Sequence, residues 1–442
     1  MPHVRTLRHA HIVRISLCFA AIAVMLATAS CGLANRDRQE EPDRPSITDA
    51  PTSTIVTPAP SQAATPTPTP SVDDQLLETI RRMDLTAKVG QLVMVGLDGT
   101  FLNESALRMI QEDKVGGFIL FRSNIKSAEQ TNTLLNELKT ANGENAVPLW
   151  LGVDQEGGRV SRLPSELRQT PSARQVASAN DPAFTREISE AIGTELKALG
   201  FNMNFAPVLD INSNPRNPVI GDRAFGDNPK DVIAHGLASM NGLSEGGVAA
   251  VVKHFPGHGD TAVDSHLDLP LIDKSLEELE SFELLPFREA IRQGADAVMV
   301  GHLLMRQLDD ERPASLSPAV IRELLRDRLQ YDGVVMTDDM TMGALRKGYG
   351  MGEAAVQSVL AGADLLLVCH EERLQLEVLQ ALEQAAEQGI LTEQRIDESL
   401  LRLLRLKYQY ALSDEPSPPV DPEALNERMD SVMDDHPSSI SR

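Results

Sequence analysis

The chain has 442 residues, and its 41 lysines and arginines against 64 aspartates and glutamates give a formal net charge of −23. A surface this acidic repels phosphate backbones and anionic lipid headgroups, which argues against nucleic acid as a partner and against a polybasic membrane patch. Hydrophobic residues make up 42% of the chain and charged residues 24%, as in a folded globular protein. Three cysteines are too few for a disulfide framework or a four-cysteine metal site.

The first 31 residues have the pattern of an export signal. A basic start precedes an apolar run from Ile15 to Leu26, and small residues precede Cys31. The run is shorter than the roughly 20 residues that a membrane-spanning helix needs. Small residues before a cysteine resemble a bacterial lipoprotein signal, in which Cys31 is lipidated, although Thr28 stands where such signals have leucine. A cleaved secretory signal with an incidental cysteine is the alternative.

Three further segments follow the signal. Residues 32–72 are rich in proline and threonine, and this composition predicts a disordered, extended tether. Residues 73–412 have the alternating patterns of one folded domain. Residues 413–442 form an acidic tail with prolines but no strong periodicity, for which we predict no element beyond a short helix at its end.

Within residues 73–412, short apolar runs alternate with longer helical patterns. Runs rich in valine, isoleucine and leucine predict parallel strands buried on both faces at Gly90–Gly96, Gly117–Phe121, Pro148–Val153, Met203–Leu209, Val248–Phe255, Ala297–Gly301, Val334–Thr337 and Leu365–Cys369. Helices are expected at Asp181–Leu199, Lys230–Glu245, Ser275–Gln293, Ser317–Leu329 and Glu371–Gln388. Ser275 with Glu278 forms a capping box, and Gly200 and Gly294 end helices. These strand–helix units predict an α/β fold, a (β/α)₈ TIM-type barrel, with a doubly wound sheet as the alternative.

Polar residues follow most of these strands. They are Asp154, Asp210, Lys253, His254, His302, Asp338, Asp339 and His370. Because the C-terminal ends of barrel strands lie at one end of the barrel, we expect these side chains to line one pocket.

The longest polar stretch runs from Lys253 to His266 and contains two glycines and a proline, so it is expected to be an ordered loop. Imidazole beside carboxylate, as in Asp264 and His266, suits proton transfer. A metal site is the alternative, but the lysine in the cluster opposes a cation. The sequence therefore predicts neither a metal nor another cofactor.

Three motifs occur in order: Gly152–Val160 (GVDQEGGRV), the loop from Lys253 to His266, and Val335–Met342 (VMTDDMTM). Together they resemble glycoside hydrolase family 3, in its bacterial β-N-acetylhexosaminidase (β-N-acetylglucosaminidase) branch, over residues 73–412. The resemblance implies a retaining hydrolase that releases terminal β-N-acetylglucosamine from amino-sugar glycosides through a covalent glycosyl-enzyme.

The resemblance also implies residue roles. Asp338 is the nucleophile, and His266 is the acid/base with Asp264 as its partner. Asp339 is the rival nucleophile, but neighbouring side chains on a strand point to opposite faces, and we expect Asp339 to cap a helix. The sugar-binding residues are Asp154, Arg162, Arg223, Lys253 and His254.

Several residues have a second interpretation. Arg162 and Arg223 would alternatively form salt bridges that fix loops, and Arg159 is assigned such a structural role. His258 and His302 either line the pocket or are loop histidines with satisfied hydrogen bonds. Trp150 and Cys369 are expected in the core. The aromatic content of 4% argues against a long polysaccharide cleft.

Other functions stay open at this point. A β-glucosidase or β-xylosidase of the same family typically takes its acid from a second domain after the barrel, and about 30 residues after Leu412 are too few for one. A phosphorylase is a second alternative, since sequence alone does not separate water from phosphate as the acceptor. A sugar-binding transport lipoprotein would have two lobes instead. We expect an exported protein on the outer face of the cytoplasmic membrane, touching the membrane only through its lipid anchor. The oligomeric state is left open.

Overall fold

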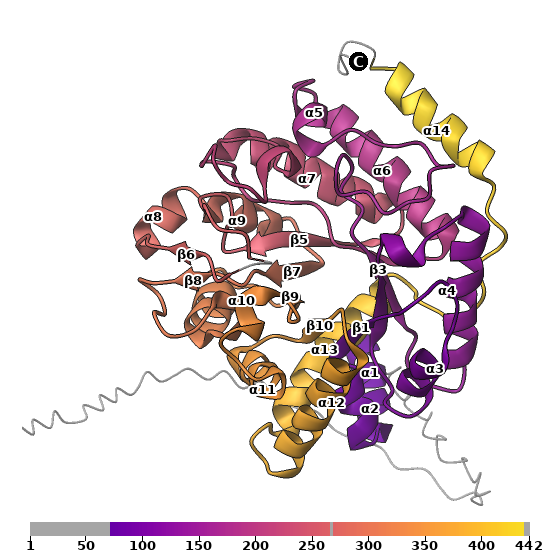
Figure 1. Ribbon diagram of the computed structural model, residues 1–442, viewed down its shortest axis with the longest axis vertical. Coiled ribbons are helices and arrows are strands. Elements are labelled where there is room, and N and C mark those ends of the chain that lie inside the picture. The colour runs from indigo at the N-terminus through magenta and orange to yellow at the C-terminus, as the bar shows by residue number, and fades with distance from the viewer. Residues whose placement is uncertain (1–70, 266–267, 437–442) are drawn as a thin grey trace, which may run out of the picture. The chain divides into compact units, whose positions relative to one another are not determined.

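The computed structural model describes residues 71–265 and 268–436 (Figure 1). The export signal with Cys31, the tether up to residue 70, and His266 lie outside the described residues. Parallel strands close into a barrel in the order β1-β10-β9-β7-β5-β4-β3-β2. The predicted (β/α)₈ barrel is therefore confirmed.

The barrel strands lie where the apolar runs predict them. They are β1 (Val93–Gly96), β2 (Gly117–Leu120), β3 (Trp150–Val153), β4 (Met203–Asn204), β5 (Ala249–Phe255), β7 (Ala297–Val300), β9 (Val334–Asp339) and β10 (Leu365–Val368). β4 is shorter than predicted because Pro207 has no N–H for the ladder; a single parallel bridge from Val208 to Lys253 follows. Outside the barrel, β6 (Leu271–Ile272) and β8 (Leu304–Met305) form a small second sheet.

Three predicted helices are observed within a residue of their expected ends: α6 (Pro182–Leu199), α7 (Pro229–Glu245) and α12 (Glu372–Glu387). Ser275 and Glu278 form the predicted capping box, and Gly200 ends α6 with a φ of 108° that suits glycine. The others are α1 (Val72–Arg82), α2 (Leu85–Gly90), α3 (Glu104–Gln111), α4 (Ala128–Asn142), α5 (Ala173–Ala177), α10 (Gly343–Arg346), α11 (Met351–Ala361), α13 (Glu393–Gln409) and α14 (Pro422–Asp434), with short 3₁₀ turns at Arg122–Asn124, Gly221–Arg223 and Ala314–Leu316.

Two predicted helices differ from expectation. The segment predicted as one helix from Ser275 is divided into α8 (Leu276–Ser281) and α9 (Leu284–Arg292). Pro286 has no N–H to donate to the carbonyl of Phe282, so one continuous helix is not formed there. The segment Ala319–Arg328 is a π-helix.

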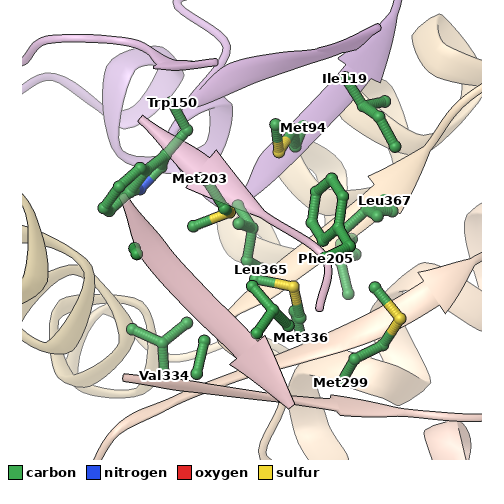
Figure 2. Packing of buried hydrophobic residues seen from close by; sticks show 14 of the residues in the cluster. Met94, Ile119, Trp150, Met203, Phe205, Met299, Val334, Met336, Leu365 and Leu367 are labelled. Atoms are coloured by element: carbon green, nitrogen blue, oxygen red, sulfur yellow. The ribbon is translucent and has the colours of Figure 1, made fainter. Parts of the chain in front are cut away.

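Large apolar side chains fill the barrel. Figure 2 shows Met94, Phe205 and Met336 packed together between the strands. Gly152 makes this packing fit, because a Cβ there would lie 2.8 Å from Met94 Cε and 2.9 Å from a Phe205 ring carbon. Trp150 is fully buried, as predicted. The filled interior leaves the open end of the barrel as the place for a pocket.

Buried polar networks hold the N-terminal end of the barrel. Lys407 of α13 donates to the Pro148 carbonyl at 2.6 Å and to Gln91 Oε1 at 2.8 Å. Asp364, just before β10, pairs with Arg326 at 2.5 Å and accepts from Ser399 Oγ at 2.6 Å. These contacts bind α13 and the outer helices to the strand starts.

The tail after residue 412 is more ordered than the sequence predicts. Asp414 accepts from Asn142 Nδ2 at 2.7 Å and from the Leu149 N–H at 3.2 Å. The chain then continues into α14, which lies beside α6 (Figure 1). In the part of the chain that the structure describes, no helix has both the length and the apolar character to span a bilayer.

Candidate active site

A pocket of about 340 Å³ opens at the C-terminal ends of the barrel strands. This volume is near the lower end of the roughly 300–1,000 Å³ typical of small-molecule sites, and it suits one sugar unit better than a polymer. Its polar lining includes Asp154, Arg162, Arg223, Lys253, His254, His258, Asp338, Asp339 and His370. The predicted convergence of strand-end residues is thus observed for most of them, whereas Asp210 and His302 are buried beneath the pocket.

Two cations and two carboxylates form a compact array on one wall. Lys253 Nζ lies 2.6 Å from Asp154 Oδ1 and 2.8 Å from Glu156 Oε1. Arg223 binds Glu156 with both branches, Nε to Oε2 at 2.8 Å and Nη2 to Oε1 at 2.7 Å. The four formal charges cancel within the array, and its members Asp154, Lys253 and Arg223 line the pocket, where they offer fixed donors and acceptors to a polyol.

Glu156 is a site residue that the sequence analysis did not name. Burial alone would raise the pKa of Glu156, but the charges of Arg223 and Lys253 outweigh burial and hold the pKa well below its usual range. Glu156 is therefore an anionic anchor for the two cations and is unsuited to donate a proton. Its place in the GVDQEGGRV motif was the available signal.

Asp338 lies at the end of β9 and faces the pocket. Burial opposes its ionisation, yet nearby His254, His302 and Lys253, with the Asp339 N–H that donates at 2.8 Å, lower the pKa of Asp338 to about 2. The carboxylate is therefore charged at neutral pH, the form that can attack an anomeric carbon.

Asp339 does not cap a helix, contrary to expectation. Its Oδ1 accepts from the Thr341 N–H at 2.9 Å and from the Cys369 N–H at 3.1 Å. The residue before α10 is Met342, with no side-chain cap. Asp339 thus fixes the turn after β9 to the end of β10, and it lies four residues before Gly343, the first residue of α10, which is too far to cap that helix.

Asp210 organises the chain at the end of β5. It accepts from His254 Nδ1 at 2.6 Å and from the His258 N–H at 2.6 Å. His258 contacts Thr261 Oγ1 at 2.9 Å and Ser265 Oγ at 3.1 Å. His258 therefore lines the pocket and also has its hydrogen bonds satisfied, so both of its predicted interpretations apply.

For His302, the structure agrees with the second interpretation, a histidine with satisfied hydrogen bonds that does not line the pocket. It is fully buried, with Nδ1 2.7 Å from Ser315 Oγ and Nε2 3.0 Å from the Asp339 carbonyl. It supports the chain directly after Asp338.

The loop that leads to His266 is fixed on both sides. A Cβ at Gly259 would lie 1.7 Å from the Ile211 carbonyl oxygen, so only glycine fits this close approach. At the far end, the Ser265 carbonyl accepts from the Ala344 N–H at 3.1 Å, which ties the loop to α10. Asp264 is part of this loop, while His266 lies outside the described residues.

The three predicted loop arginines behave differently. Arg159 Nη2 donates to the Ile220 carbonyl at 2.9 Å and Arg159 Nε pairs with Asp222 at 3.0 Å, which is the structural role expected. Arg162 lines the pocket, and its Nε is buried without a hydrogen-bond partner among the described residues. Arg223 is the salt-bridged arginine of the array above.

The pocket holds an aromatic pair, formed by the predicted strand-end residue His370 and by Phe121, which the sequence did not single out. The rings of Phe121 and His370 lie 4.8 Å apart between centroids, and both residues line the pocket. His370 Nε2 is 3.8 Å from Asp339 Oδ2. Phe121 ends a predicted strand, but the sequence does not show whether an apolar residue at that position lines the pocket.

Comparison with known proteins decides the family. Residues 84–406 match the glycosyl hydrolase family 3 N terminal domain. The chain belongs to glycoside hydrolase family 3. The match covers all strands of the barrel, so the family assignment and the fold describe the same part of the chain.

Two proteins of known structure are similar to this chain over the barrel. A β-N-acetylglucosaminidase from Paenibacillus sp. str. FPU-7 is 46% identical, with a TM-score of 0.75, over 79% of this chain and 68% of that one. LpqI from M tuberculosis is 34% identical, with a TM-score of 0.69, over 75% of this chain and 96% of that one. The curated beta-hexosaminidase A of Pseudoalteromonas piscicida is 34% identical over 332 residues, and this chain spans 56% of its length. A beta-hexosaminidase of Stenotrophomonas maltophilia is 36% identical, with 84% of its length covered.

Proposed function

We propose that this family 3 protein is a retaining β-N-acetylhexosaminidase that releases terminal β-N-acetylglucosamine through a covalent glycosyl-enzyme on Asp338. The observation that carries the proposal is the ionised Asp338 carboxylate in a pocket that is also lined by Asp154, Lys253 and Arg223, with Glu156 behind them as the partner of both cations. The names of the relatives, β-N-acetylglucosaminidase and beta-hexosaminidase, favour the same substrate class.

The proposed mechanism has two steps. In the first, the Asp338 carboxylate bonds to the anomeric carbon while His266 donates a proton to the departing oxygen. In the second, His266 takes a proton from water, the water oxygen bonds to the anomeric carbon, and the bond to Asp338 breaks. Asp264 favours the charged imidazole before the first step. Ser265, the residue before His266, lines the pocket and is tied to α10 by the Ala344 N–H, which supports the role proposed for His266.

The sugar-binding roles follow from the donor and acceptor types. Asp154 accepts hydroxyl protons, while Arg162, Arg223, Lys253 and His254 donate to hydroxyl or acetamido oxygens. Because Lys253 and Arg223 are already paired with carboxylates, they bind a neutral sugar without leaving a buried charge uncompensated.

Trapping of the intermediate tests the proposal. An activated 5-fluoro-N-acetylglucosaminyl fluoride should form a slowly hydrolysed adduct on the peptide that contains Asp338, detected by mass spectrometry. Turnover of nitrophenyl N-acetylglucosaminide without any adduct on Asp338 would contradict the assigned nucleophile. A rate that requires phosphate and yields the sugar phosphate would indicate a phosphorylase, and binding without turnover would indicate a transport protein.

We also propose that the chain is exported and held at the outer face of the cytoplasmic membrane by lipid on Cys31, where it acts on amino-sugar glycosides in cell-wall recycling. The support is the sequence pattern before Cys31. Cys31→Ala should release the full-length protein from the membrane fraction of its host, and a chain that begins at residue 71 should keep full activity. Unchanged membrane association of the Cys31 variant would refute the anchor and leave the enzymatic proposal intact.

A further inference from the structure

We infer that α14 positions the loop that carries Arg162 at the sugar pocket; the inference rests on the sugar-binding role proposed for that arginine. α14 spans Pro422–Asp434, whereas the family match ends at residue 406. α14 therefore lies outside the part of the chain that the family model covers.

α14 has a firm base on the barrel's outer layer. Met429 is 0% exposed and belongs to the core cluster. This buried residue anchors α14, and Figure 1 shows α14 and α6 side by side. The pair of Arg428 Nη2 with Glu190 of α6 at 2.8 Å is exposed to solvent and adds little to the anchor. A helix anchored in this way can hold a neighbouring loop.

The other contacts of α14 bind the loop after β3. Asn426 accepts from the Arg168 N–H at 2.7 Å and donates to the Glu166 carbonyl at 2.8 Å. Asp430 accepts from Arg168 Nε at 2.6 Å and also from its Nη2. The Asn426 amide thus satisfies a backbone donor and a backbone acceptor two residues apart, as a neighbouring strand would, and it fixes the path of the loop itself.

The same loop reaches the pocket through Arg162. Gln155 Oε1 accepts from the Arg162 N–H at 2.8 Å on the barrel side, and Leu163 and Leu167 are buried between that point and Arg168. The loop is therefore held by Gln155 at one end and by α14 at the other. Because Arg162 Nε has no hydrogen-bond partner among the described residues, the guanidinium depends on the loop backbone for its position.

The test compares two ion pairs of α14 with similar exposure. Side-chain exposure is 49% and 41% for Arg168 and Asp430, and 47% and 36% for Arg428 and Glu190. Asn426→Ala with Asp430→Ala should raise KM for nitrophenyl N-acetylglucosaminide about tenfold or more, since small misplacements of a binding group are costly, with kcat less affected. Arg428→Ala should leave KM unchanged.

Two further readouts separate positioning from stability. Amide hydrogen exchange in residues 159–168 should accelerate in the Asn426/Asp430 variant and not in Arg428→Ala. When Asp430→Glu replaces Asp430→Ala in that variant, KM should fall back toward the value of the unaltered protein, because the glutamate keeps a carboxylate for Arg168. Equal KM values in all variants, or equal changes in Arg428→Ala, would overturn the inference. Absence of N-acetylglucosaminidase activity in the unaltered protein would instead refute the proposed function.

Discussion

The charges around Asp338 set its ionisation. With a pKa of about 2, this carboxylate is charged throughout the pH range in which most proteins are studied. The acid limb of the pH–rate profile must then arise from another group. Both side-chain oxygens of Asp339, the next residue, accept hydrogen bonds from Thr341 in the turn after β9.

Asp338→Ala should lower kcat on nitrophenyl N-acetylglucosaminide by at least about 10⁴-fold, because it removes the nucleophile. Asp339→Ala should have a smaller effect, since it loosens only the turn. Thermal unfolding of both variants checks that the fold is kept. Near-normal rates in Asp338→Ala together with an inactive Asp339→Ala would show that the two aspartates have been assigned the wrong way round.

His266 is tested by the choice of leaving group. A poor leaving group needs the donated proton and a dinitrophenolate does not, so His266→Ala should cost a disaccharide substrate about 10²–10⁴-fold more than a dinitrophenyl glycoside. Asp264→Ala should cause a smaller loss and lower the apparent pKa of the basic limb. Equal losses on both substrates would make His266 a positioning residue.

Glu195 on α6 is 1% exposed, and neither carboxyl oxygen has a hydrogen-bond partner among the described residues. Burial raises the pKa of Glu195 from 4.5 to about 8. Between these two pH values the folded state keeps a proton that the unfolded state has lost, so this group lowers the free energy of unfolding as pH rises.

Glu195→Gln should therefore stabilise the protein increasingly from pH 5 to pH 8, by an amount on the order of 3 kcal/mol at pH 7. Urea denaturation at several pH values measures this directly. A difference between the variant and the parent that does not change with pH would mean that Glu195 is charged in the folded state.

At the scale of elements, β5 and its following loop depend on one buried aspartate. Asp210→Ala removes the partner of His254 and of the His258 N–H, and it should cost about 3–5 kcal/mol of stability, as breaking a buried pair does. It should also lower kcat/KM, because the loop leads to His266. Asp210→Asn should lose less, and equal stability of all three proteins in urea would contradict this reading.

The sequence predicts elements well where a single physical signal is strong. Buried parallel strands appear as apolar runs, and all eight barrel strands were located in this way. The division of α8 from α9 was missed although Pro286 was visible, because the capping box and apolar spacing suggested one helix. A short helix was expected at the end of the tail and α14 is observed there, but its packing was not predicted because it depends on α6, which is distant in sequence.

The site divides in the same manner. Strand ends predicted which residues converge, since barrel topology alone determines that. The pairings of Lys253 with Asp154 and Glu156, and of Arg223 with Glu156, join residues on different strands and loops, and only the closed barrel brings them together. The resemblance supplied the roles, and Asp339 shows how a local rule misassigns a residue whose partner lies on β10.

At the scale of the whole molecule, a buried charge cluster at the N-terminal end of the barrel contributes to stability at a distance from the pocket. Asp364 at the N-terminal end is fully buried and lies within 4 Å of Arg326, Arg395 and Arg402. Asp364→Ala would leave three cations without their shared partner and should cost several kcal/mol, roughly 3–5. With the pocket at the opposite end, kcat at 25 °C should be unchanged, and a large loss of kcat in folded protein would contradict this separation.

Cys369 offers a consequence of its own. It ends the run of β10, is 3% exposed and lines the pocket, and burial raises the pKa of its thiol well above the ordinary value. A chain that begins at residue 71 has no other cysteine, because the remaining two are Cys18 and Cys31. A thiol reagent can then react only when the pocket wall opens, since the thiolate is the reacting form. The rate at which a thiol reagent labels Cys369 would therefore report how often the pocket wall opens. A bound sugar that holds the wall closed would lower this labelling rate.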